Sequence, residues 1–233
     1  MSRNQPLFLD VARSALGRPW RHRLDGPGLA LAENLVQVEG LGDTLSRVIA
    51  ARGVTGPDLS RFLEPKLRDL MPDPATLTGM DACVARLSDA VKRGESVAIF
   101  GDYDVDGACS SALLARYLEA AGARARIHIP DRLIEGYGPN SEAIRMLAGE
   151  GATLLVAVDC GTTSHGPFAE ALRLGMDVVV LDHHQAPVDL PAITALVNPN
   201  RQDDLSGLGH LCAAGVVFMA LVGLSREIGR AHV

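Results

Sequence analysis

The stretch Ser96-Val-Ala-Ile-Phe-Gly-Asp-Tyr-Asp-Val-Asp-Gly107 decides the fold of this chain of 233 residues. Its first five residues are small or apolar, which predicts a buried β-strand, and the glycine and acidic residues mark the end of that strand. An apolar helix is expected directly afterwards, from about 107 to 121. A buried strand followed at once by an apolar helix is typical of the β-α-β units of a parallel sheet.

The same alternation of strand and helix continues along the chain. Further strands are expected at 125–129, 153–158 and 178–181, and further helices at 81–92, 141–147, 168–174 and, buried, 211–224. The connections between these elements are short. The sequence therefore predicts an α/β fold with a mostly parallel β-sheet flanked by helices.

The first part of the chain follows a different pattern. Residues 1–25 show no periodicity and place Trp20 among arginines, so an arm is expected there. Short amphipathic stretches between 29 and 70 predict a small helical segment before the sheet. We therefore expect an N-terminal arm and helical prelude over 1–78 and the α/β domain over 79–233.

Acidic residues and histidines follow every predicted strand. They are Asp102, Asp104 and Asp106 after the first strand, Asp131 after the second, Asp159 after the third, and Asp182, His183 and His184 after the fourth. Because the carboxyl ends of parallel strands line one crevice of an open sheet, these side chains are expected to converge although they span about 80 positions.

Such a group of carboxylates predicts a bound cation, because like charges within a few ångströms raise one another's pKa or require a counter-ion. Oxygen ligands with an imidazole suit Mn²⁺ or Mg²⁺, and the histidine favours Mn²⁺. Each piece alone has an ordinary explanation: a solvated acidic loop, a helix cap at Asp159, or a structural pair at His183 and His184. Their joint placement favours a divalent-metal site.

Three segments resemble motifs I to III of the DHH phosphoesterase superfamily: 101–107, Val158-Asp-Cys-Gly161 and Asp182-His-His184. Three further strings resemble its branch of single-stranded-DNA-specific exonucleases: Ile127-His-Ile-Pro-Asp-Arg-Leu-Ile-Glu-Gly-Tyr-Gly-Pro-Asn140, Val197-Asn-Pro-Asn-Arg201 and Leu211-Cys-Ala-Ala-Gly-Val216. The resemblance covers about residues 40 to 225.

The resemblance implies a role for each site residue. The expected ligands of two metal ions are Asp102, Asp104, Asp106, Asp159 and His183, with Asp159 bridging; the expected catalytic residues are Asp104, Asp106, Asp159, His183 and His184. Adjacent residues of an extended segment point in opposite directions, so His184 is assigned to the scissile phosphate and not to the metal. Asp182 is expected to orient a histidine. Arg132 and Tyr137 are expected to contact a phosphate and a base, although a simple turn with Tyr137 packed against it is an equal alternative.

The activity implied is 5′-to-3′ exonuclease cleavage of single-stranded DNA in repair and recombination, by two-metal activation of water. A single-strand-binding protein and a helicase are the partners implied. Two alternatives stay open: a DHH-type phosphodiesterase acting on small nucleotides or oligonucleotides, and a catalytically incomplete fragment that binds DNA or protein. The superfamily's fourth motif supplies a further Asp, and no convincing candidate follows His184. We therefore expect an N-terminal fragment or truncated gene product, with an incomplete DHH domain and without the second, substrate-gripping domain.

Composition bears on these alternatives. The net charge of −6 argues against a nucleic-acid binder, but carboxylates that hold metal ions count in this sum and are neutralised when loaded. No secretory signal or membrane span is expected. Four widely spaced cysteines, Cys83, Cys109, Cys160 and Cys212, predict small buried residues in a reducing compartment, the cytoplasm.

Overall fold

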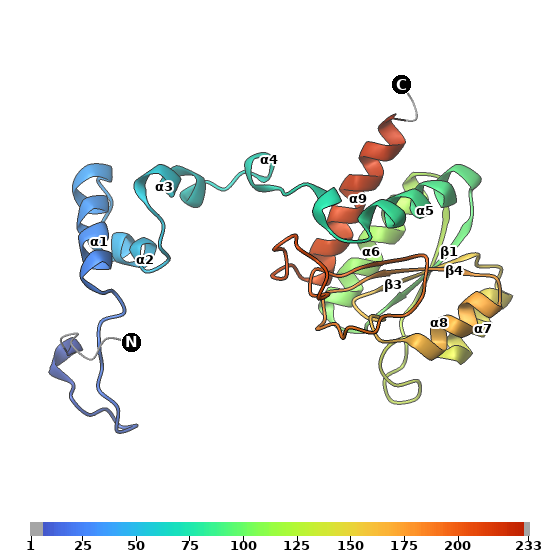
Figure 1. Cartoon of the computed structure of the whole chain (residues 1–233), viewed down its shortest axis with the longest axis horizontal. Helices are drawn as coiled ribbons and strands as arrows, with labels where there is room; N and C mark the ends of the chain where they lie inside the picture. Colours follow the sequence, from blue (N-terminus) through green and yellow to red (C-terminus); the bar gives the residue numbers. More distant parts are fainter. Residues whose placement is uncertain (1–6, 231–233) are drawn as a thin grey trace. The chain divides into compact units, whose positions relative to one another are not determined.

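The computed structural model describes residues 7–230 and consists of two compact units, Met1–Met71 and Pro72–Val233 (Figure 1). The chain passes from the first unit to the second at Met71 and Pro72. The division into an arm with a helical prelude over 1–78 and a DHH domain over 79–233 stays a prediction. Of the expected arm, residues 1–6 lie outside the described part.

The first unit is a small helical assembly. A short 3₁₀ turn at Phe8–Asp10 is followed by helices α1 (Gly26–Glu39), α2 (Asp43–Ala50), α3 (Gly56–Leu63) and α4 (Leu67–Leu70). Leu35, Ile49 and Leu59 form its buried core, one residue from each of the three longer helices. Asp25 accepts a hydrogen bond from the N–H of Gly28 and so caps α1. The small helical segment expected before the sheet is confirmed.

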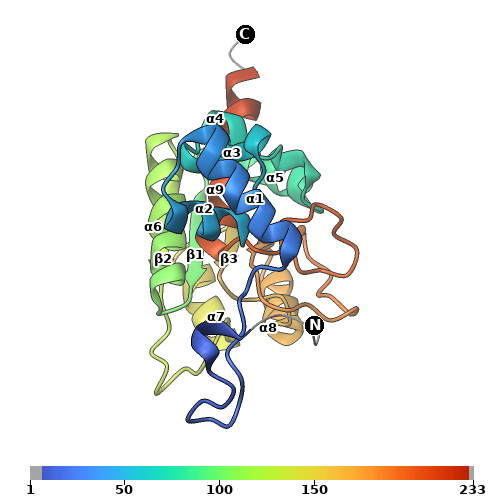
Figure 2. The same cartoon turned by 90° about the vertical axis from the view of Figure 1, so that its left-hand side faces the viewer.

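The second unit contains a five-stranded parallel sheet of order β2-β1-β3-β4-β5. Its strands are β1 (Ser96–Gly101), β2 (Arg124–His128), β3 (Leu154–Val158), β4 (Asp177–Leu181) and β5 (Ala195–Val197). Strands β2, β1 and β3 can be followed in this order in Figure 2. The order reverses between β1 and β3, and ligands of open α/β sheets bind at such a reversal, outside the carboxyl ends of the strands. The predicted α/β class is confirmed, and β5 is a strand that the sequence did not reveal.

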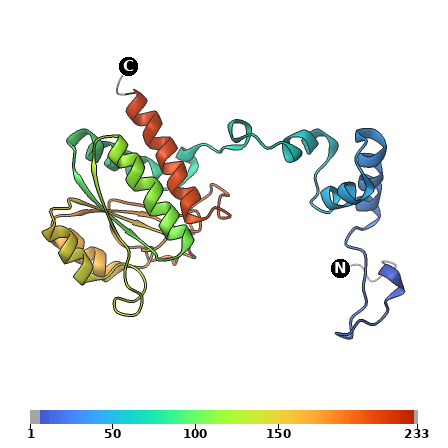
Figure 3. The same cartoon turned by 180° about the vertical axis from the view of Figure 1, so that it is seen from behind.

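Helices cover both faces of the sheet. Helices α5 (Met80–Arg93), α6 (Val105–Ala120) and α9 (Ala213–Arg230) lie on one face, with α9 packed against both α5 and α6 (Figures 1 and 3). Helices α7 (Ser141–Gly149) and α8 (His165–Arg173) lie side by side on the other. The residues of β1, β3 and β4 are almost entirely buried, as expected for a parallel sheet covered on both faces, whereas those of the edge strand β2 are exposed or partly buried. No described helix is long and apolar enough to cross a membrane.

The expectation of four buried cysteines is wrong for two of them. Cys83 and Cys160 are buried, whereas Cys109 and Cys212 are exposed. Gly107, Ser110, Ser111 and Leu114 are the buried positions at the start of α6, and this helical spacing leaves Cys109 on the outer side. Cys212 lies in the loop that precedes α9.

Gly107 is pressed against the backbone of Asp102 where the chain turns from β1 into α6. A Cβ atom added at Gly107 would clash with the carbonyl oxygen of Asp102. It would also lie 2.7 Å from both the backbone nitrogen and the carbonyl carbon of Asp102. Only glycine therefore lets the first turn of α6 fold back against the end of β1.

The Gly107→Ala variant should lower the free energy of unfolding by about 1–3 kcal/mol, because the added methyl group meets backbone that cannot yield. Gly166, at the start of α8, is the matched control, since an added Cβ would meet open space there. Gly166→Ala should be neutral or stabilise the chain by up to about 1 kcal/mol. Urea unfolding measures both variants, and wild-type stability of Gly107→Ala would contradict the close approach.

Candidate metal centre

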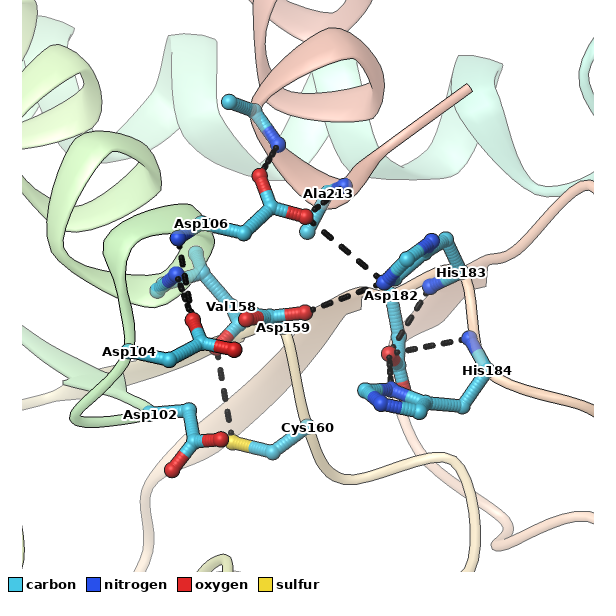
Figure 4. Close-up of polar contacts among 12 residues, drawn as sticks. Asp102, Asp104, Asp106, Val158, Asp159, Cys160, Asp182, His183, His184 and Ala213 are labelled. Carbon is cyan, nitrogen blue, oxygen red and sulfur yellow. Dashed lines mark hydrogen bonds and ion pairs between the residues drawn. The ribbon is translucent and has the colours of Figure 1, made fainter. Parts of the chain in front are cut away.

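The carboxyl ends of β1, β3 and β4 bring seven side chains to one edge of the sheet (Figure 4). They are Asp102, Asp104, Asp106, Asp159, Asp182, His183 and His184. Asp131, which follows β2, was expected to join them, and this prediction is wrong. Its carboxylate is exposed and accepts a hydrogen bond from the N–H of Leu133, inside its own loop.

Two clusters of potential metal ligands share the carboxylate of Asp159. One consists of Asp102, Asp104 and Asp159, and the other of Asp159, His183 and His184. In each cluster one ligand atom from every residue lies within 4.8 Å of the others. The structure thus places Asp159 between two ligand groups, the position in which one carboxylate can contact two cations.

Asp159 is buried and strained. It is 1% exposed, directly follows β3, and has a left-handed backbone with φ of 60°, which Asp and Asn tolerate better than most residues. Its N–H donates to the carbonyl of Leu181 at the end of β4. Burial, and then the negative charges of Asp106 and Asp104, raise the pKa of its carboxyl to about 7.

Asp104 and Asp106 hold the ends of two helices. Asp104 caps α6, because its carboxylate accepts hydrogen bonds from the N–H groups of Asp106 and Gly107; the bond from Gly107 is the main cause of its lowered pKa. The Asp106 carboxylate accepts from the N–H groups of Ala213 and Ala214, at 2.7 and 2.8 Å, and so fixes the start of α9. One of its oxygens also lies 3.6 Å from Nε2 of His183.

Asp102 is also buried, 6% exposed. It accepts a hydrogen bond from the N–H of Tyr103. Burial, and then the charge of Asp104, raise its pKa. A cation bound beside Asp102 would offset the cost of ionising its carboxyl.

The two histidines have different partners. Nε2 of His183 lies 3.3 Å from a carboxylate oxygen of Asp159. Nδ1 of His184 lies 2.8 Å from a carboxylate oxygen of Asp182. Burial lowers the pKa of His184, but the hydrogen bond to Asp182 and nearby negative charges outweigh this effect and raise it. The rings do not point in opposite directions as expected: their centroids are 4.8 Å apart, because the chain has left β4 and bends at His184.

A network of uncharged side chains behind the histidines was missed by the sequence analysis. Asn198, which follows β5, is fully buried, and its amide NH₂ donates to the carbonyl of His184 and to the hydroxyl of Thr162, both at 2.9 Å. The Thr162 hydroxyl in turn donates to Asp182 at 2.6 Å. Asn200 donates to the carbonyl of His183. The string Asn198-Pro-Asn200 was the signal in the sequence that could have indicated this network. It was overlooked because amide side chains carry no charge and so do not stand out in a pattern of charged residues.

Arg132 and Tyr137 lie beside the cluster. The guanidinium of Arg132 lies over the ring of Tyr103, 4.5 Å from its centroid, donates to its hydroxyl, and is 5.8 Å from the centroid of Tyr137. The Tyr137 hydroxyl donates to the carbonyl of Asp159 at 3.4 Å, and its ring lies 6.2 Å from that of His184. The structure thus adds Tyr103 to the two residues expected here.

Comparisons with known proteins show which family the part of the chain around this site resembles. The model of the DHH family, N-terminal domain, matches residues 96–232. The single-stranded-DNA-specific exonuclease RecJ of Bacillus subtilis is 30% identical over 91% of this chain, which spans only 27% of that relative's length. RecJ of Thermus thermophilus is similar in structure: its complex with Mn²⁺ is 29% identical, with a TM-score of 0.70 over 88% of this chain and 28% of its own. Its complex with Mg²⁺ is 27% identical, with a TM-score of 0.57 over 88% and 25%.

The charge of Asp159 should destabilise the metal-free protein. Folding raises the pKa of this carboxyl to about 7. The stability of the metal-free protein therefore falls as the pH rises from the ordinary pKa of an aspartate towards about 7, and it stays low above that pH. At about pH 8 the Asp159→Asn variant should therefore be more stable than the wild type, by at least ~1 kcal/mol. Asn keeps the left-handed backbone, which Ala would strain further.

Urea unfolding with and without Mn²⁺ tests this prediction. Mn²⁺ should stabilise the wild type and have little effect on Asp159→Asn. A metal-free Asp159→Asn variant that is less stable than the wild type would show that the carboxylates do not repel one another as described.

The Asn198→Ala variant should bind Mn²⁺ about 10–100-fold more weakly, because it frees the segment that carries both histidines. It should also lower the free energy of unfolding by about 1–3 kcal/mol, since buried acceptors lose their donor. Asn140→Ala is the control: it removes the hydrogen bond that caps α7, which costs about 1 kcal/mol, and should leave Mn²⁺ affinity unchanged. Equal Mn²⁺ affinity of the two variants, measured by calorimetry, would rule out this role of Asn198.

Proposed function

The chain belongs to the DHH family, and we propose that it carries the metal-binding part of an exonuclease that hydrolyses phosphodiester bonds of single-stranded DNA in the 5′-to-3′ direction. The observation that carries this proposal is the carboxylate of Asp159, shared by two ligand clusters at the strand ends. The relatives named RecJ support the choice of substrate. The activity, substrate and partners of the whole protein are proposals, because the chain spans 27% of the Bacillus subtilis relative.

The donor set fits Mn²⁺ or Mg²⁺. We assign Asp102 and Asp104 to one ion, His183 and Asp106 to the other, and Asp159 to both. Carboxylate oxygens with one imidazole are ligands that suit Mn²⁺ and, with weaker preference, Mg²⁺. Burial, and then the charges of neighbouring carboxylates, raise the pKa values of Asp102 and Asp159, and a bound cation would offset both effects. Ions bound there would lower the pKa of a water molecule and offset charge that develops at phosphorus.

The protein's own side chains would then hold and orient the substrate. Asp182 occupies Nδ1 of His184, so Nε2 is the nitrogen left to donate to an oxygen of the scissile phosphate. The raised pKa of His184 favours the protonated ring that this contact needs. We assign Arg132 to a neighbouring phosphate and Tyr137 to a base, since the guanidinium and the aromatic ring lie together beside the cluster.

A second candidate function keeps the site and changes the substrate to a short oligonucleotide or small nucleotide. The net charge of −6 favours it, because long nucleic acids are usually bound by basic surfaces. The sequence similarity to single-strand exonucleases favours the first candidate.

We further propose a helicase and a single-strand-binding protein as partners, because the substrate strand must be separated from its complement and kept accessible. The compartment proposed is the cytoplasm, where the DNA of the bacterial relatives lies. The four cysteines, which form no disulfide among the described residues, are compatible with a reducing compartment.

A Mn²⁺-dependent assay with end-labelled single-stranded DNA, the matching duplex and a dinucleotide tests the proposal, using this chain and a version continued with the remainder of the Bacillus subtilis relative. Single-stranded DNA should be degraded fastest. His184→Ala should lower kcat by about 100-fold or more, whereas His165→Ala, an exposed histidine at the start of α8, should have no effect. Consumption of the dinucleotide without degradation of DNA would establish the second candidate.

A further inference from the structure

The first unit presents an exposed tryptophan beside a run of basic residues. Residues 7–21 form a small hairpin, in which the N–H of Phe8 donates to the carbonyl of Trp20 and the N–H of Trp20 donates to the carbonyl of Val11 (dark blue in Figure 1). Trp20, the only tryptophan of the chain, is 49% exposed. The hairpin leads directly into His22 and Arg23.

A cavity of about 350 Å³ opens next to this hairpin, within the same unit. Its lining consists of His22, Arg23, Leu24, Thr44, Arg47, Val48, Ala51 and Arg52. Thr44, Arg47, Val48 and Ala51 follow the spacing i, i+3, i+4 and i+7, so they form one face of α2 and its last turn. Ile49, on the opposite face of α2, belongs to the core and fixes the helix in this orientation.

The lining is basic, which is unusual in a chain of net charge −6. It contains three guanidinium groups and one imidazole, and no carboxylate. Arg47 is paired with Asp43, whereas the side chain of Arg52 donates to the carbonyl of Val48 and has no ion pair within the described part of the chain. No ion pair is found for Arg23 among residues 7–230. Leu24, Val48 and Ala51 provide an apolar surface between these charges.

We propose that this cavity and Trp20 together bind single-stranded DNA, with phosphates at the arginines and a base stacked on the indole. The proposal rests on the proposed function and adds a contact for its substrate away from the metal centre. Trp20 and Arg23 are three positions apart in the chain, which limits their backbone distance to about 11 Å, so one short stretch of a DNA strand can reach both. Guanidinium groups bind phosphates and aromatic faces stack on bases of any sequence.

An acidic protein segment is the competing occupant, because it also carries negative charge. The exposed indole favours DNA: an acidic peptide has no need of a flat aromatic surface, whereas base stacking on an aromatic ring contributes about 1–3 kcal/mol per base.

The test uses the fluorescence of Trp20, the single tryptophan, as a direct probe of occupancy. The full chain is titrated with an oligothymidylate in chelator, so that no hydrolysis occurs, at several salt concentrations. The fluorescence should be quenched, and the apparent affinity should fall with salt. A duplex or a poly-glutamate peptide of equal charge should quench much less, since neither offers an unstacked base.

The Arg23→Gln/Arg52→Gln double variant should bind at least tenfold more weakly at low salt, and its log–log salt slope should be smaller by about 1.4, at about 0.7 per lost phosphate contact. Arg68→Gln/Arg116→Gln is the control: it removes equal charge from exposed arginines outside the cavity and should bind as the wild type does. Arg23→Lys/Arg52→Lys should keep most of the salt slope. Binding retained by this charge-conserving variant shows that replacing the two side chains does not in itself disrupt the cavity.

Absence of quenching, or equal affinity of the cavity and control variants, would overturn the proposal. Stronger quenching by poly-glutamate than by the oligonucleotide would also overturn it and assign the cavity to an acidic protein. Hydrolysis is measured separately, so the two proposals fail separately: cleavage of DNA without a fluorescence change contradicts only the cavity, and quenching without any cleavage contradicts only the nuclease.

Discussion

The burial of the Asp159 carboxylate beside other carboxylates is the constraint on which the rest of the site depends. Asp159 is 1% exposed, and Asp102, Asp104 and Asp106 lie around it. Burial and like charge together make its ionised form costly, and a cation removes both costs at once. A protein that gathers acids in this way gives up stability in the metal-free state, and metal binding restores it.

Elements of the fold hold these charges in place. Gly107 lets α6 begin directly against β1, so that Asp104 can cap the helix from the strand end. Asp106 binds the first N–H groups of α9 and thereby connects a helix from the end of the chain to the first acidic motif. Asn198 and Thr162 restrain the histidine segment through backbone and carboxylate contacts. Displacement of any of these elements should therefore move the proposed metal ligands.

Much of this arrangement could be predicted from the sequence. Long apolar runs such as 96–101 and 178–181 identify buried strands, and acids directly after them are recognisable because charge at a strand end is conspicuous. The three-residue strand β5 was missed because so short a run has no periodicity. Asn198 was missed for a related reason, since it acts through an amide and through contacts with residues far away in the sequence. Asp131 was wrongly included because the rule about strand ends gives proximity but not the direction in which a loop turns.

The central claim is that one carboxylate, that of Asp159, contacts two metal ions. Anomalous diffraction from crystals of this chain grown with Mn²⁺ tests it most directly. We expect two Mn²⁺ peaks, one beside Asp102 and Asp104 and the other beside His183 and Asp106, with the Asp159 carboxylate within bonding distance of both. A single ion bound without Asp159, or two ions of which one does not contact it, would contradict this role of Asp159.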